Sequence, residues 1–225
     1  MNSRRALATS ATFVLVLALT SSAFAATPAA KPAAKPAPPK PAPAKSEVAV
    51  FAMGCFWCAE TAFEGQPGVI SAVSGYTGGR TKNPTYEEVG SGTTGHAESI
   101  EVTFDPAKTS YEKVLDLFWH NVDPTQKNGQ FCDHGNQYRS AIFYADEAQH
   151  RLALASEKKI EESGILKAPI VTQIVPLGPF TRAEEYHQDF YKKDPERYYS
   201  YREGCGRDRR LAQLWGGLAG HPAVH

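Results

Sequence analysis

The sequence has no excess of charge of either sign. Its 225 residues include 24 Lys and Arg against 24 Asp and Glu, which gives a formal net charge of zero. A protein without net charge exerts no broad electrostatic attraction on nucleic acids or on acidic membrane surfaces. Binding must therefore take place at a specific site, and we expect no nucleic acid among the partners.

The sequence also lacks a hydrophobic run long enough for a permanent transmembrane anchor. The apolar run near the N-terminus extends from about Ala11 to Leu19, whereas a spanning helix needs about 20 apolar residues. Two arginines precede this run, and small residues follow it up to Ala25. This order is typical of a secretory signal peptide over residues 1–25 that is cleaved after Ala25. We expect an exported protein, periplasmic or secreted, with an uncleaved signal anchor as the alternative.

Residues 26–46 have few side chains that could pack into a core. They consist almost wholly of Ala, Pro and Lys, a composition that forms an extended, semi-rigid linker. Hydrophobic residues make up 42% of the whole sequence and aromatic residues 11%, which is enough for one globular domain. We assign residues 47–215 to this domain and residues 216–225 to a tail.

The domain mixes segments with the periodicity of strands and of helices. Strands are expected near residues 47–53, 69–76, 96–104, 138–144 and 170–175, and helices near 55–65, 110–120, 146–163 and 181–191. No internal repeat indicates a solenoid or a propeller. The mixture predicts an α+β fold, a two-layer sandwich with helices packed on a mixed sheet.

Four cysteines are present, and in an exported protein they would ordinarily form structural disulfides. Cys55 differs because it begins a predicted helix directly after a strand that stops at Gly54. At such a position the free backbone N–H groups and the helix dipole stabilise a thiolate. Cys58 lies one helical turn further on, an arrangement known from redox pairs. This context favours a reactive nucleophile at Cys55.

Five motifs, in this order and at this spacing, resemble the peptide methionine sulfoxide reductases of the A class. They are GCFWCAE at 54–60, GYTGG at 75–79, NPTYEEV at 83–89, GHAE at 95–98 and DHGNQYRSAI at 133–142. The resemblance covers about residues 48–191. It implies a ferredoxin-like βαβ core and thiol-dependent reduction of the S epimer of methionine sulfoxide, free or in proteins.

The resemblance also implies roles for eight residues. Four are catalytic: the nucleophile Cys55, the acid Glu98, and two tyrosines that hydrogen-bond the sulfoxide oxygen, Tyr86 and Tyr138. Four contact or adjoin the substrate: Phe56 and Trp57 around its methyl group, the polar Asp133, and His187. A sulfoxide sulfur is a poor electrophile until its oxygen is protonated. Glu98 can supply that proton only if burial raises its pKa.

Attack on the sulfoxide leaves a sulfenic acid on Cys55, which a second thiol converts to a disulfide. The chain departs here from the commoner family pattern, because Cys58 stands where glycine is usual and QFCD at 130–133 replaces QGND. Cys205 lies between two glycines, which predicts a flexible segment. Cys205 and Cys58 are therefore close candidates for the resolving thiol, and Cys132 is the third. A static Cys132–Cys205 disulfide is the alternative.

We expect no bound cofactor and no metal. The resemblance implies an external thioredoxin-like thiol donor and oxidised methionine-containing proteins as partners, and we expect a monomer. One alternative function is dithiol exchange by a thioredoxin-like oxidoreductase built on Cys55 and Cys58. Others are a disulfide-stapled binding module without free thiols, and a zinc site with four ligands: Cys55, Cys58, Cys132 and His134.

Overall fold

The computed structural model describes residues 46–220. The predicted signal peptide and nearly all of the predicted linker fall in residues 1–45, which lie outside the described residues, as do residues 221–225. Within the described range, no helix combines the length and the hydrophobicity that crossing a membrane requires.

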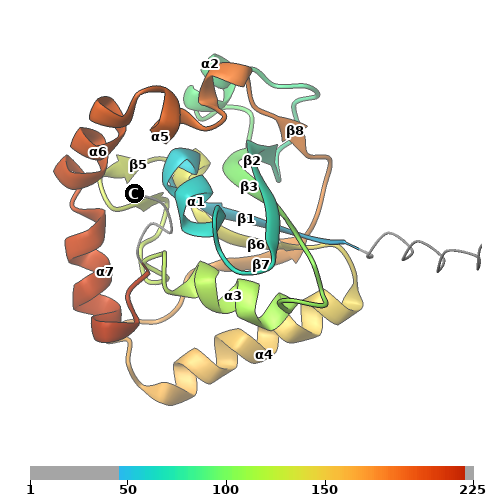
Figure 1. Cartoon of the computed structure of the whole chain (residues 1–225), viewed down its shortest axis with the longest axis vertical. Coiled ribbons are helices and arrows are strands. Elements are labelled where there is room, and N and C mark those ends of the chain that lie inside the picture. The colour runs from blue at the N-terminus through green and yellow to red at the C-terminus, as the bar shows by residue number, and fades with distance from the viewer. Residues whose placement is uncertain (1–45, 221–225) are drawn as a thin grey trace, which may run out of the picture. The chain divides into compact units, whose positions relative to one another are not determined.

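A six-stranded mixed sheet forms the centre of the domain (Figure 1). Its strands, in spatial order, are β7 (Gln173–Pro176), β6 (Ser140–Tyr144), β1 (Glu47–Met53), β3 (Ala97–Phe104), β2 (Val69–Thr77) and β8 (Thr181–Arg182). β6 and β7 are parallel, and the other neighbours are antiparallel. A separate two-stranded sheet consists of β4 (Gly129–Gln130) and β5 (Asp133–His134).

Two helices complete a ferredoxin-like core. α1 (Phe56–Phe63) connects β1 to β2, and α3 (Tyr111–Trp119) follows β3. Because β3 lies between β1 and β2 and is antiparallel to both, β1 and β2 are parallel and α1 closes a split βαβ unit. With β6 on the other side of β1, the order β6-β1-β3-β2 is that of a βαββαβ core. The predicted α+β class is confirmed.

The other helical elements lie mainly after β6. They are α2 (Tyr86–Gly90), η1 (Asn136–Tyr138), α4 (Glu147–Ser163), η2 (Glu185–His187), α5 (Phe190–Lys193), α6 (Pro195–Gly204), α7 (Arg207–Trp215) and η3 (Gly216–Leu218). In Figure 1, α6 and α7 run along the same side of the domain as β5.

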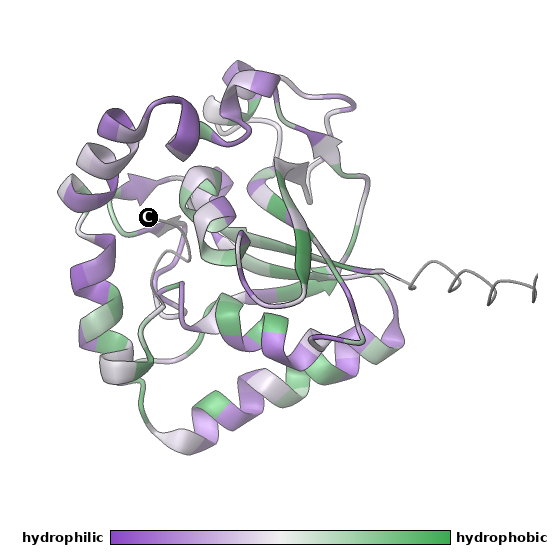
Figure 2. Cartoon of the chain, viewed as in Figure 1, coloured by the Kyte–Doolittle hydropathy of each residue, from purple (hydrophilic) through white to green (hydrophobic). Residues whose placement is uncertain are grey.

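The hydrophobic core has two parts because β1 is buried on both faces. On one face, the ring of Phe51 stacks on those of Phe63 and Phe118, with centroids 5.5 Å and 5.0 Å apart. On the other face, Val50 belongs to a smaller cluster against which Phe180 packs. A strand buried on both faces is apolar throughout, and Figure 2 shows hydrophobic residues concentrated on the central strands. Packing on both faces thus fixes the end of β1, and with it the turn that leads to Cys55.

The helix predicted over residues 181–191 is wrong. β8 pairs with β2 at its start, and the side chain of Gln188 exchanges two hydrogen bonds with the backbone of Ser74. Asp189 has a φ of +53°, and its N–H donates to Glu60 Oε1. The segment is thus anchored to β2 and α1, and only the short η2 and α5 are helical.

Candidate active site

Cys55 lies in a buried turn between β1 and α1. The turn requires glycine at Gly54, where φ is +79° and a Cβ would lie 2.6 Å from the Cβ of Gln130. Cys55 is the N-cap residue of α1 and is 7% exposed. Its thiol makes no cap hydrogen bond. Instead, the N–H of Phe56 donates to Glu98 Oε2 at 3.0 Å. This backbone N–H was one of those expected to stabilise a Cys55 thiolate, but in the structure it binds the carboxyl group of Glu98.

Cys55 and Cys58 are free, buried thiols one helical turn apart, joined by a backbone hydrogen bond from the N–H of Cys58 to the carbonyl of Cys55 at 3.1 Å. Burial raises the pKa of Cys55, and the interaction of its side chain with that of Cys58 raises it further. The same side-chain interaction lowers the pKa of Cys58 against the effect of burial, and the positive charges of Arg207 and Arg202 act in the same direction. The pair therefore places its first negative charge on Cys58 and keeps a proton on Cys55.

Glu98 supplies an acidic proton beside these thiols. It lies on β3 opposite Tyr76 of β2 and is 3% exposed. Burial raises its pKa to about 8, although the hydrogen bond from the N–H of Phe56 acts in the opposite direction. At neutral pH the carboxyl group is therefore mainly protonated, which is the condition that a general acid requires.

Aromatic rings form one wall of the site. The ring of His187 lies 4.9 Å from that of Phe56, 4.3 Å from that of Tyr86 and 5.8 Å from that of Trp57. Trp57 Nε1 donates to His187 Nδ1 at 3.1 Å, and burial lowers the pKa of His187 to about 4. The imidazole is therefore neutral at pH 7 and carries its proton on Nε2. A small methyl group would fit such a wall.

Two tyrosines face the same acidic groups. Burial raises the pKa of Tyr86 to about 12 and also raises that of Tyr138, and the nearby charge of Glu98 is the next contribution to each. Both hydroxyl groups therefore stay protonated and can donate hydrogen bonds. Glu184, which the sequence reasoning did not identify, holds this part in place, because it accepts from the N–H of Tyr86 at 2.9 Å and from the hydroxyl of Tyr76 at 2.7 Å.

Asp133, on β5, completes the polar side of the site. Burial raises its pKa, and its charge in turn raises the pKa of Cys55 and of Glu98. Tyr201 of α6 donates to Asp133 Oδ2 at 2.5 Å and lies edge-on to Trp57. The structure thus gathers around one site the eight residues predicted for catalysis and substrate contact.

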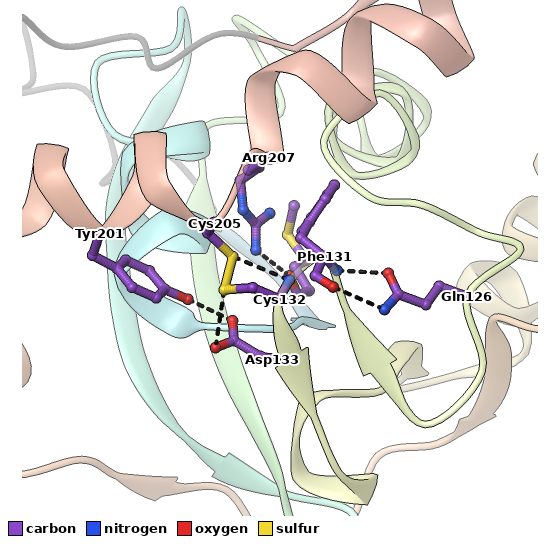
Figure 3. Close-up of a disulfide and its surroundings, with 8 residues drawn as sticks. Gln126, Phe131, Cys132, Asp133, Tyr201, Cys205 and Arg207 are labelled. Carbon is purple, nitrogen blue, oxygen red and sulfur yellow. Dashed lines mark hydrogen bonds between the residues drawn. A yellow bond between two sulfur atoms is a disulfide. The ribbon is translucent and has the colours of Figure 1, made fainter.

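The two remaining cysteines form a disulfide, Cys132–Cys205, beside Asp133 (Figure 3). This pairing is the alternative considered from the sequence. The segment predicted to be flexible lies between two helices, because Cys205 is the C-cap residue of α6 and α7 begins at Arg207. The arginines on either side, Arg202 and Arg207, are both buried. Because Cys132 is bonded to Cys205, the alternative zinc site is not assembled.

A large pocket lies elsewhere in the domain. It is bordered by α3, α4 and the end of α7, and its lining includes Trp119, Leu152, Ile160 and Trp215. None of the predicted site residues lines this pocket. Its size is therefore no guide to the chemistry, since a methylsulfinyl group needs only a small recess beside the thiol.

Comparison with known proteins identifies relatives over the whole domain. The family described as peptide methionine sulfoxide reductase matches residues 47–218. The peptide methionine sulfoxide reductase MsrA of Bacillus licheniformis is 57% identical over 172 residues, which cover 76% of this chain and 95% of the relative. The MsrA of Bacillus subtilis is 55% identical over 172 residues, which cover 76% of this chain and 97% of the relative.

Solved structures agree with the sequence relatives. Methionine sulfoxide reductase A of Corynebacterium diphtheriae superposes with a TM-score of 0.61 at 34% identity, covering 69% of this chain and 77% of that chain. The reduced form of Mxr1 from Saccharomyces cerevisiae superposes with a TM-score of 0.64 at 30% identity, covering 70% of this chain and 90% of that chain.

Proposed function

The chain belongs to the peptide methionine sulfoxide reductase family, and we propose that it reduces the S epimer of methionine sulfoxide, in proteins and as the free amino acid, with Cys55 as the nucleophile. One observation carries this proposal. The carboxyl group of Glu98 is buried, has a raised pKa and is hydrogen-bonded to the N–H of Phe56, the residue next to Cys55. An acid and a thiol therefore converge where one S–O group can meet both.

The first step uses the proton arrangement of the thiol pair. Cys58, whose pKa is lowered, acts as the base and takes the proton of Cys55, which lies one helical turn away. The Cys55 thiolate attacks the sulfoxide sulfur while Glu98 protonates the oxygen, and the hydroxyls of Tyr86 and Tyr138 donate to that oxygen. Methionine leaves, the oxygen remains on Cys55 as a sulfenic acid, and Glu98 is left ionised.

The second step forms a disulfide. The Cys58 thiol attacks the Cys55 sulfenic acid, the S–O bond breaks, and the hydroxyl leaves with the thiol proton as water. The sum of both steps is one sulfoxide, one thiol, one thiolate and the proton of Glu98 converted to one sulfide, one disulfide and one water, and Glu98 then regains a proton from solvent. Cys58 is favoured over Cys205 and Cys132 because it is a free thiol one helical turn from Cys55, whereas the other two are bonded to each other.

The enzyme then needs an external reductant. A thioredoxin-like dithiol protein would attack the Cys55–Cys58 disulfide by thiol exchange and restore both thiols, so the proposed reaction requires no bound cofactor. The signal-like residues 1–25 and the linker at 26–46 support export to the periplasm or the medium. There the substrates would be exported proteins with oxidised methionines, and the enzyme would act as a monomer.

The test compares the S and R epimers of a methionine-sulfoxide peptide as substrates, with dithiothreitol as reductant. The intact chain should reduce the S epimer, and Cys55→Ser should abolish turnover. If neither the S nor the R epimer were reduced, the proposal would be contradicted. That result would leave dithiol exchange by Cys55 and Cys58 as the remaining enzymatic function, because both are free thiols.

A further inference from the structure

The Cys132–Cys205 disulfide runs beside a second cross-link between the same two segments. The covalent bond joins Cys132 to the C-cap residue of α6. One residue further along the first segment, Asp133 accepts a hydrogen bond from Tyr201, which lies one helical turn before Cys205. Figure 3 shows the disulfide and the Tyr201–Asp133 pair next to each other. Asp133 is thus linked to α6 in two ways, by the disulfide of its neighbour Cys132 and by the hydrogen bond from Tyr201.

The other end of this loop is fixed to β1, the strand that ends two residues before Cys55. Phe131 exchanges two backbone hydrogen bonds with the side chain of Gln126, at 2.6 Å and 3.1 Å. The guanidinium group of Arg207 lies 4.2 Å from the ring centre of Phe131 and donates to the carbonyl of Met53 at 2.9 Å. The loop, the end of β1 and the start of α7 therefore form one rigid unit.

Cys205 could approach Cys55 or Cys58 only if this unit came apart. Its N–H closes the last turn of α6 on the carbonyl of Tyr201 at 2.8 Å. Three residues before it, Arg202 is paired with Asp208 of α7, and two residues after it, Arg207 is buried against Met53. These contacts oppose the swing that delivery of electrons from Cys205 would require.

We propose that the Cys132–Cys205 disulfide is a positioning clamp, which holds Asp133 against the substrate pocket and carries no electrons in turnover. The clamp rests on the proposed function, in which Cys55 and Cys58 together supply both electrons. Reduction of one sulfoxide oxidises two thiols. If Cys132 and Cys205 do not exchange electrons with Cys55 and Cys58, a fully reduced chain can therefore reduce only one sulfoxide without added reductant.

Electron counting tests this directly. The chain is reduced at all four cysteines, freed of reductant under anaerobic conditions and given excess methionine-S-sulfoxide peptide. One methionine per chain is expected, with Cys55–Cys58 as the new disulfide in a peptide map. Two methionines per chain would overturn the clamp, because Cys132 and Cys205 would then have passed their electrons on. No methionine at all would contradict the proposed function instead.

The positioning role has its own readout. In Cys132→Ser/Cys205→Ser, measured with dithiothreitol, the KM for the S-sulfoxide peptide should rise roughly tenfold or more, because small displacements of a positioned group are costly, while kcat stays within about twofold. Tyr201→Phe, which removes the parallel hydrogen bond, should change KM in the same direction. Tyr199→Phe, on the same helix but 39% exposed, is the control and should change neither parameter. A lower Tm with an unchanged KM would overturn the positioning role, because the disulfide would then only stabilise the fold.

Discussion

At the scale of single residues, Glu98 reverses its ordinary protonation state and Cys55 lacks the activation expected at the start of a helix. A carboxyl group in water is ionised at neutral pH, but burial raises the pKa of Glu98 to about 8. A cysteine at the start of a helix is usually activated, but Cys55 keeps its proton because Cys58 bears the charge. The reaction therefore starts with a neutral acid and a protonated nucleophile.

Activity should depend on pH through Cys58 and Glu98. The thiolate of Cys58 and the protonated form of Glu98 are the active ones, so kcat/KM should be retained between about pH 6 and about pH 8 and should fall as pH rises through about 8. Glu98→Gln should lower kcat by roughly 10²- to 10⁴-fold and should remove this fall, since an amide does not titrate. Glu101→Gln, on the same strand but on its opposite face, is the matched control and should follow the wild-type profile. An alkaline fall that persisted in Glu98→Gln would assign the titration to another group.

Replacement of Cys58 separates the two steps of the reaction. A Cys58→Ser chain should still release up to one methionine per chain, more slowly because the thiolate that receives the Cys55 proton is lost, and should then stop at the sulfenic acid. Dimedone labelling of Cys55, read by mass spectrometry, measures that intermediate. Prompt disulfide formation in the Cys58→Ser chain would instead identify Cys205 or Cys132 as the resolving thiol.

At the scale of secondary-structure elements, the β1–α1 junction was predictable and the segment over residues 181–191 was not. The apolar run of β1 and the following Gly54 indicate a buried strand and a turn from local sequence alone. By contrast, Gln188 and Asp189 bond to Ser74 and to Glu60, partners more than a hundred residues away. Helical periodicity contains no information on such partners, so the predicted helix was wrong.

The junction itself predicts a stability difference between two glycines. Gly54→Ala places a Cβ 2.6 Å from Gln130 at a φ of +79°, so it should lower the free energy of unfolding by more than about 1 kcal/mol. Gly90→Ala, at the end of α2, has no atom within 4 Å of the new Cβ and should stay within about 0.5 kcal/mol of wild type. Urea unfolding of both variants measures the difference, and equal midpoints would contradict the steric argument.

At the scale of the whole molecule, the site is assembled from distant parts of the sequence. Motifs identified most of its residues, because catalytic roles follow residue type and order. Arg207 and Met53 are 154 residues apart, and Tyr201 and Asp133 are 68 apart. No motif marks Tyr201, Arg207 or Glu184, since these residues act through contacts that only the folded chain creates.

Export also belongs to this scale. If residues 1–25 are a cleaved signal, the protein recovered from the periplasm or the medium of a producing bacterium should begin at Ala26. Intact mass and N-terminal sequencing decide this. A protein that retains Met1 and fractionates with membranes would indicate an uncleaved anchor.

The shared proton of Cys55 and Cys58 has a protective consequence. Peroxides and other small oxidants attack thiolates far faster than thiols. The resting enzyme offers such oxidants a protonated sulfur that is 7% exposed, and keeps its charged sulfur at 1% exposure. Small oxidants thus meet two buried sulfurs, the more exposed of which is protonated, and we expect their attack on the resting enzyme to be slow.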